Sequence, residues 1–267
     1  MRERAFRRRG RTRPAISREG PVGLPGADRP RRALLRILLR SATAAFAWVL
    51  LGSCAALTPV RLESEILGPT LLVIAGVHGD EPSGPAAARA LAAGKPARRG
   101  RLLILPEANP KALAAESRAV PGRGDLNRAF PGRGFGTPAE RRAAALFRMI
   151  QSARPDLVLD LHESDGTWTE GQGPFLVVPA LPRAAELALA MLNVPGMEGF
   201  SYTGGPPAGS LAAESSGRLG IPALIVEIPD SVPPPRRAEL HKLAVEAAMA
   251  VLGMMDTGEE GRIKPCR

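Results

Sequence analysis

Short apolar runs alternate with alanine-rich stretches along the chain from Leu57 onward, a pattern typical of an α/β domain. The apolar runs predict strands at 71–77, 101–106, 155–163, 175–179 and 223–228. The stretches between them predict helices at 82–93, 137–153, 181–193 and 236–252. Because helices connect most of the strands, we expect a mainly parallel sheet. Residues 107–136 show no clear periodicity, and a loop of this length is usually functional or disordered.

Two of the three histidines come at the ends of predicted strands. His78 follows an apolar run and has Glu81 three residues after it, and His162 ends a second run. In open α/β sheets, ligands bind beyond the carboxyl ends of the strands. A short His-x-x-Glu pair can also be a hydrogen-bonded turn, but a distant third ligand completes a donor set that zinc uses in hydrolytic sites, with one position left open. The sequence therefore predicts one zinc ion held by His78, Glu81 and His162.

A carboxylate lies inside the last predicted strand, where Glu227 interrupts an apolar run. A buried carboxylate is costly unless it is paired or used, and burial raises its pKa toward the range of a working general base. Asp160 or Glu163 could orient an imidazole, and the sequence does not decide between them. His241 lies on the amphipathic terminal helix and is predicted to be a surface residue.

The glycine-rich loop before residue 136 contains arginines and an amide side chain. Arg118 and Arg123 precede the Asn127-Arg128 pair. These arginines could be solvated surface charge, but an arginine fork beside an amide also suits bidentate recognition of a carboxylate. Tyr202, the only tyrosine, is a candidate for substrate contact, although a lone tyrosine often has only a packing role.

The positive charge of the chain is confined to its beginning. Residues 1–40 hold 13 arginines and three acidic residues, which accounts for the whole formal net charge of +10. The remainder is formally neutral, so the charge does not indicate a nucleic-acid partner for the folded domain. We expect residues 1–56 to be an export signal or basic leader and residues 57–267 to form the catalytic domain.

The leader has the composition of an export signal: a basic segment, an apolar stretch at 37–51 and small residues at 52–56. Residues 31–36 resemble a twin-arginine motif, and residues 51–54 resemble a lipoprotein cleavage box in which Cys54 would carry the lipid. The expected location is therefore periplasmic or lipid-anchored, with membrane attachment through this segment. The alternatives are an uncleaved anchor, or a cytoplasmic protein whose start codon is placed too far upstream.

Four motifs occur in order along the domain: HGDE at 78–81, DLNRAFPG at 125–132, DLHE at 160–163 and VEIP at 226–229. Together they resemble the zinc carboxypeptidase superfamily, in particular its succinylglutamate desuccinylase and aspartoacylase branch. The resemblance implies a single α/β domain with a mainly parallel, twisted mixed sheet flanked by helices. It also implies a zinc-dependent hydrolase of amide bonds next to a carboxylate, in an N-acyl amino acid or a small peptide.

The resemblance implies a role for each candidate residue. His78, Glu81 and His162 would be the zinc ligands, and Glu227 would be the general base and acid. Arg118 would polarise the scissile carbonyl. Asn127 and Arg128 would hold the carboxylate of the substrate.

Two features also resemble the murein peptide amidases of the same superfamily, which act on cell-wall peptides. These are the seven-residue step from Arg118 to Asp125 and the segment from Tyr202 to Ser210. In addition, only about forty residues follow Glu227, whereas desuccinylases and aspartoacylases usually carry a further small β-rich domain. A non-catalytic exported protein that binds carboxylates, or a structural lipoprotein with an unused site, is the remaining alternative, although neither needs a general base.

Overall fold

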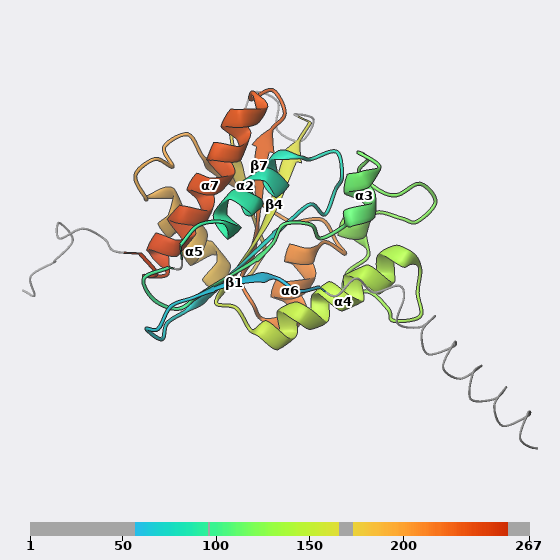
Figure 1. Cartoon of the computed structure of the whole chain (residues 1–267), viewed down its shortest axis with the longest axis horizontal. Helices are drawn as coiled ribbons and strands as arrows, with labels where there is room; N and C mark the ends of the chain where they lie inside the picture. Colours follow the sequence, from blue (N-terminus) through green and yellow to red (C-terminus); the bar gives the residue numbers. More distant parts are fainter. Residues whose placement is uncertain (1–56, 96, 166–172, 256–267) are drawn as a thin grey trace, which may run out of the picture. The chain divides into compact units, whose positions relative to one another are not determined.

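The computed structural model describes residues 57–95, 97–165 and 173–255, which all belong to the second of two units into which the chain divides, residues 54–267 (Figure 1). The expected export signal, Cys54 and the expected C-terminal tail at 256–267 lie outside the described residues, so the interpretations of these segments stay predictions. Among the described residues, no helix combines the length and apolar character that crossing a membrane requires.

The core of the domain is a seven-stranded mixed sheet in the order β1-β3-β2-β4-β7-β5-β6. Its four central strands, β3, β2, β4 and β7, are parallel. The strand β1 pairs antiparallel with β3, and β5, itself parallel to β6, pairs antiparallel with β7. The strands are β1 (Val60–Glu63), β2 (Thr70–Ala75), β3 (Arg101–Leu105), β4 (Leu157–Ser164), β5 (Phe175–Val178), β6 (Ser201–Gly204) and β7 (Ala223–Pro229). The predicted single α/β domain with a mainly parallel mixed sheet is confirmed.

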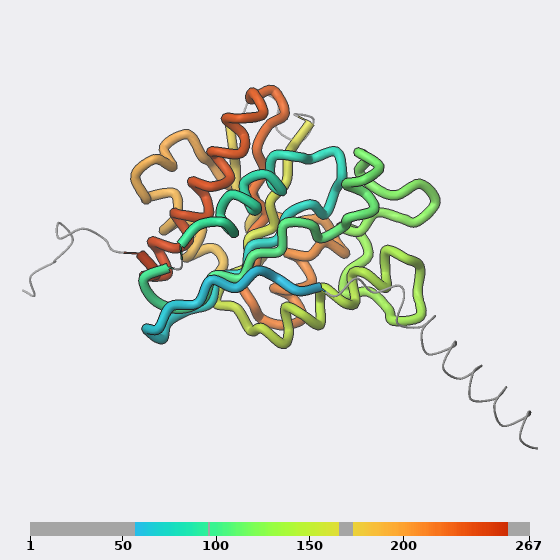
Figure 2. Tube along the Cα trace, viewed as in Figure 1, coloured from blue at the N-terminus to red at the C-terminus, as the bar shows by residue number. Residues whose placement is uncertain are grey.

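Helices cover both faces of the sheet, because alternate side chains of the buried strands point to opposite sides. Leu71 and Val73 of β2 pack with α2 (Ser83–Ala92), α5 (Pro182–Leu192) and α7 (Pro234–Val251). Leu72 and Ile74 pack with α4 (Pro138–Ala153) and α6 (Leu211–Leu219) on the other face. Although α2 and α7 are far apart in the sequence, they lie side by side (Figure 2).

The predicted strands and helices agree with the structure to within two residues at each end. The helix at 138–153 begins with the expected capping box, in which the Thr137 side chain accepts from the Glu140 backbone and Glu140 accepts from the Thr137 backbone. The expectation that residues 107–136 form a loop was partly wrong, because they contain α3 (Pro110–Ala114) and the short 3₁₀ helix η1 (Leu126–Arg128). The edge strands β1 and β6 and the helix α6 were not predicted.

The prediction that His241 is a surface residue was wrong. His241 is fully buried in α7, which packs against both α2 and α5 as well as the sheet, so more than one side of the helix is covered. Neither ring nitrogen has a hydrogen-bond partner among the described residues. Burial away from water lowers the pKa of His241 to about 3, because the charged imidazolium is disfavoured there.

His241 should therefore make the stability of the domain depend on pH. Below the ordinary histidine pKa of 6.5, His241 binds a proton in the unfolded chain, whereas in the folded chain it stays neutral down to about pH 3. The free energy of unfolding therefore decreases as the pH falls from 6.5 to about 3. The slope is about 1.4 kcal/mol per pH unit. We expect His241→Leu to remove this contribution, which urea unfolding of both proteins at pH 7, 6 and 5 would measure. Parallel stability curves for the two proteins would contradict the prediction.

Candidate active site

The turn after β2 presents His78 and Glu81. β2 ends at Ala75, so His78 lies three residues beyond the strand rather than at its last position. The turn is held by α3 and the residues that follow it. The Gly79 N–H donates to the carbonyl of Ser117, three residues after α3 ends, at 3.0 Å, and a Cβ at Gly79 would lie only 1.9 Å from the carbonyl oxygen of Ala112 in α3. Only glycine permits this close approach. Glu81 then comes just before α2 begins at Ser83.

His162 and Glu227 come from the neighbouring central strands β4 and β7. They are direct register partners in the parallel ladder, and their side chains therefore emerge on the same face of the sheet. Both lie inside their strands, since β4 continues to Ser164 and β7 to Pro229. Both line a cavity of about 680 Å³, as do His78 and Glu81.

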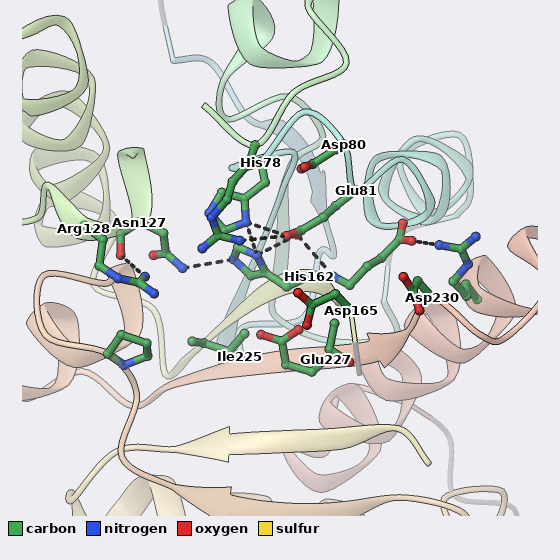
Figure 3. Close-up of a pocket in the computed structure, with 15 residues that line it drawn as sticks. His78, Asp80, Glu81, Asn127, Arg128, His162, Asp165, Ile225, Glu227 and Asp230 are labelled. Atoms are coloured by element: carbon green, nitrogen blue, oxygen red, sulfur yellow. Dashed lines mark hydrogen bonds and ion pairs between the residues drawn. The ribbon is translucent and has the colours of Figure 1, made fainter. Parts of the chain in front are cut away.

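His78, Glu81 and His162 converge in this cavity, as the sequence predicted (Figure 3). The Nδ1 atoms of His78 and His162 are 3.2 Å apart. Glu81 Oε1 lies 2.6 Å from Nδ1 of His78, and Glu81 Oε2 lies 2.8 Å from Nδ1 of His162. All three residues are buried, and each offers a ligand atom within 4.8 Å of the others. A tetrahedral zinc site with bonds of about 2.0–2.1 Å separates its ligand atoms by about 3.4 Å. The donors therefore fit zinc in chemical type, and their atoms, now 2.6–3.2 Å apart, need to separate by less than about 1 Å to hold it.

Two aspartates orient the histidine rings. Asp125 Oδ1 lies 3.3 Å from Nε2 of His78, and Asp160 Oδ2 lies 3.0 Å from Nε2 of His162. The His78 contact is a hydrogen bond, and when Nε2 donates to this carboxylate, Nδ1 is left with its lone pair free for a metal. The His162–Asp160 contact is an ion pair without hydrogen-bond geometry, since neither Asp160 oxygen has a hydrogen-bond partner among the described residues. The Nδ1 atoms of both histidines face the shared point between them.

The charges around the cluster keep its carboxylates ionised. Burial alone would raise the pKa of Glu81, but the adjacent imidazoles of His162 and His78 outweigh it and hold that pKa at about 2. In the same way, contacts with His78 and Arg118 hold the pKa of Asp125 below its ordinary value despite burial. Against the effect of burial, Asp125 and Glu81 raise the pKa of His78. A metal must displace these ring protons, so metal affinity should fall as the pH falls.

Glu163 has a structural role rather than an orienting one. Its side chain points to the other face of β4, where Oε1 accepts from the Ser83 N–H at the start of α2, at 2.6 Å, and Oε2 pairs with Arg237 of α7. A carboxylate at a helix N-terminus is stabilised by the helix dipole. Glu163 thus fastens α2 and α7 to the end of β4, and Asp160 is the residue that contacts the imidazole.

Glu227 lies across the same cavity from the cluster. Its residue is 8% exposed, and its side chain has no hydrogen bond or ion pair among the described residues. Burial raises the pKa of Glu227 to about 7, and the negative charges of Glu81 and Asp160 act in the same direction. This is the range in which a carboxylate can both accept and return a proton near neutral pH.

Arg118, predicted to polarise the scissile carbonyl, and the predicted substrate-binding residues Asn127 and Arg128 also line the cavity. Arg118 is half-exposed, with Nε 3.2 Å from Asp125 Oδ2 and NH1 3.8 Å from Glu81 Oε1. Asn127 is buried, its Oδ1 accepts from the N–H of Leu211, and its Nδ2 lies 3.4 Å from Nε2 of His162. Arg128 is exposed, and its NH1 donates to the Asn127 carbonyl at 2.8 Å.

The structure does not bring the other two candidates to this cavity. Tyr202 lies on the edge strand β6, is 57% exposed and is not among the residues that line the cavity. Arg123 is an exposed residue that does not line it either. These positions give no support to a role in substrate binding.

The cavity has further lining residues that sequence reasoning missed. Asp165 directly follows β4 and Asp230 directly follows β7, so the strand-end criterion that selected the histidines could have found both. Arg237 reaches the cavity from α7, and nothing in the sequence marked it. The other missed lining residues are Asp80, Ser164, Pro207 and Ile225, and Glu163, which the sequence offered as an orienting residue, lines the cavity as well.

A mixed sheet with a buried His-Glu-His cluster beside the ends of its central strands defines a carboxypeptidase-like α/β domain. More narrowly, the chain belongs to the succinylglutamate desuccinylase/aspartoacylase catalytic domain family, whose profile matches residues 67–251. The family that the four sequence motifs indicated is thereby confirmed.

Individual relatives agree with this assignment. The chain is 37% identical over 116 residues to the N-alpha-acetyl-L-2,4-diaminobutyric acid deacetylase of Halomonas elongata, a match that covers 42% of this chain and 34% of the relative. An aspartoacylase family protein from Mesorhizobium loti is similar in structure, with a TM-score of 0.59 and 26% identity over 74% of this chain and 61% of that one. The chain therefore spans about a third of the curated relative and about three fifths of the solved structure.

A more distant neighbour shares the fold alone. The cell shape determinant protein Csd4 of Helicobacter pylori, a D,L-carboxypeptidase, has a TM-score of 0.65 at 18% identity, covering 74% of this chain and 56% of its own.

Proposed function

We propose that this chain is a zinc-dependent amide hydrolase of the deacylase or carboxypeptidase type. The observation that carries the proposal is the buried cluster of His78, Glu81 and His162 with the unpaired carboxylate of Glu227 in the same cavity. A protein that only binds carboxylates would need neither a metal site nor a buried base with a raised pKa. The non-catalytic alternative is therefore disfavoured.

The residues of the cavity can each take a separate role in amide hydrolysis. When bound, zinc supplies Lewis-acid chemistry that polarises a carbonyl and activates water. Glu227 takes the proton of the attacking water and returns it to the leaving amine. The guanidinium of Arg118 stabilises negative charge on the carbonyl oxygen. Arg128, with the Asn127 NH₂ group, holds a substrate carboxylate beside the scissile amide.

The proposed substrates are small molecules or short peptides that carry a carboxylate. The Halomonas elongata relative is named as a deacetylase of an N-acetylated amino acid, which supports an N-acyl amino acid. A cavity of about 680 Å³ would also admit a short peptide, so a cell-wall peptide is the alternative substrate.

Metal analysis and activity assays on the purified protein test this proposal. We expect one zinc ion per chain and hydrolysis of at least one of an N-acyl amino acid series and murein tripeptide. A chelator should abolish this activity, and added zinc should restore it. A protein that binds no zinc, or that hydrolyses amides equally well after complete metal removal, would overturn the proposal.

A further inference from the structure

Donor groups and carboxylates lie on opposite sides of the cluster formed by His78, Glu81 and His162. In Figure 3, Arg128 and Asn127 lie to the left of His162, whereas Asp165 and Asp230 lie to its right. The cavity therefore offers donors for an anion at one end and carboxylates at the other. A linear substrate whose amide lies at the cluster would extend toward both ends.

The register of the central strands fixes where the acidic end lies. His162 of β4 is paired with Glu227 of β7, and two residues further on Ser164 is paired with Pro229. The Asp230 N–H donates to the Ser164 carbonyl at 2.9 Å, so the two strands are still joined where Asp165 and Asp230 follow them. At about 3.3 Å per residue, the two aspartates come about 10 Å along the strands from the His162–Glu227 pair.

The cation that lines the cavity from α7 is already neutralised. Arg237 lines the cavity, but it forms an ion pair with Glu163, and the side chains of both are largely buried at 13% and 4% exposure. Arg237 is therefore occupied by Glu163, and it does not cancel the acidic character of Asp230 at this end of the cavity. Asp230 is exposed to the cavity and has no side-chain ion pair or hydrogen bond among the described residues.

A separate observation at the same end indicates a ligand. Ser164 lies between the two strand ends, is 7% exposed and lines the cavity. Its hydroxyl oxygen is buried and has no hydrogen-bond partner among the described residues. An unsatisfied buried hydroxyl destabilises the protein, and a donor from a bound molecule would relieve that cost.

Building on the proposed function, we propose that the acyl part of the substrate carries a cationic amino group, held by Asp165, Asp230 and Ser164. The amine part then carries the carboxylate that Arg128 binds. Hydrolysis adds the oxygen of water to the acyl carbon and breaks the carbon–nitrogen bond, and the leaving amine takes up a proton. The products are an amino-substituted carboxylic acid and an amino acid. A succinyl group would instead place a carboxylate against the two aspartates, which opposes its binding.

Three amides of one amino acid test the charge preference: the 4-aminobutanoyl, butanoyl and succinyl derivatives. Their acyl groups are similar in length and differ in charge at the end. For the zinc-loaded full-length protein, we expect kcat/KM to be about tenfold or more higher for 4-aminobutanoyl than for butanoyl, and lowest for succinyl. An equal or higher kcat/KM for the succinyl or butanoyl amide would overturn this inference and leave the proposed function standing. No hydrolysis of any of the three would overturn this inference, and the proposed function would fall with it only if the N-acyl amino acid series and murein tripeptide were not hydrolysed either.

Variants test whether Asp165 and Asp230 cause the preference for a positively charged acyl group. The double variant Asp165→Asn with Asp230→Asn should lower the ratio of kcat/KM between the 4-aminobutanoyl and succinyl amides by about tenfold or more, and Asp230→Lys should shift it further toward succinyl. Glu186→Gln removes an exposed carboxylate of α5 that does not line the cavity, and it should leave the ratio unchanged. If the double variant keeps the wild-type ratio, these aspartates do not read the substrate's charge and the inference is wrong.

Discussion

Replacing Glu227 by glutamine is expected to leave the metal in place and to reduce kcat by about 100- to 10,000-fold. Glutamine has nearly the same shape as glutamate, and Glu227 is not one of the three clustered ligand residues, so zinc content should not change. The amide cannot accept the proton of the attacking water, and this step would lose its base. Zinc content by metal analysis and kcat by steady-state assay measure the two effects separately.

A matched control distinguishes the base from a general effect of charge removal. Glu239 is an exposed carboxylate of α7 that pairs with Arg236, and Glu239→Gln should keep wild-type kcat. In the wild type, activity should fall at acid pH as Glu227 becomes protonated. A bound cation favours the ionised carboxylate, so this decline should come below the pKa of about 7 that Glu227 has without metal. If Glu227→Gln keeps full activity, another group must take the proton.

The site was predictable where sequence order dictates geometry. Parallel strands end at one edge of a sheet, so two histidines after separate apolar runs were expected to meet there, and His78 and His162 do meet. Side chains alternate between the two faces of a strand, and this alternation explains why Asp160 rather than Glu163 contacts the imidazole of His162. Asp160 lies two residues before His162 and shares its face, whereas Glu163 points to the other one. That rule was available in the sequence and would have selected Asp160.

The features that the sequence did not predict depend on tertiary packing, which the spacing of apolar residues along the chain does not reveal. His241 was assigned to the surface because one covered face was assumed for the terminal helix, whereas α7 packs against two helices and the sheet. The short helix α3 shows no periodicity over five residues, yet its backbone presses on Gly79 and shapes the turn that carries His78 and Glu81. Tyr202 was chosen as a contact residue because it is the single tyrosine, and it lies on an exposed edge strand. Rarity of a residue type is not a physical argument for a role in a site.

Replacing His78 by alanine is expected to abolish both zinc binding and hydrolysis. The variant removes one of the three proposed ligands and leaves the buried carboxylate of Glu81 without one of its two imidazole partners. A ligand that binds only the folded state raises thermal stability, so added zinc should increase the Tm of the wild type but not that of His78→Ala. His162→Ala should behave in the same way, because its Nδ1 atom faces the same point.

The third histidine provides the control for this pair. His241 is buried in α7 outside the cluster, so His241→Leu should keep zinc binding, the zinc-dependent rise in Tm and activity. The three histidine variants therefore separate loss of a ligand from loss of any buried imidazole. If His78→Ala still gained stability from zinc and hydrolysed substrate at the wild-type rate, His78 could not be a ligand. The cluster of two imidazoles and one carboxylate would then be only a hydrogen-bonded network in the core of the domain.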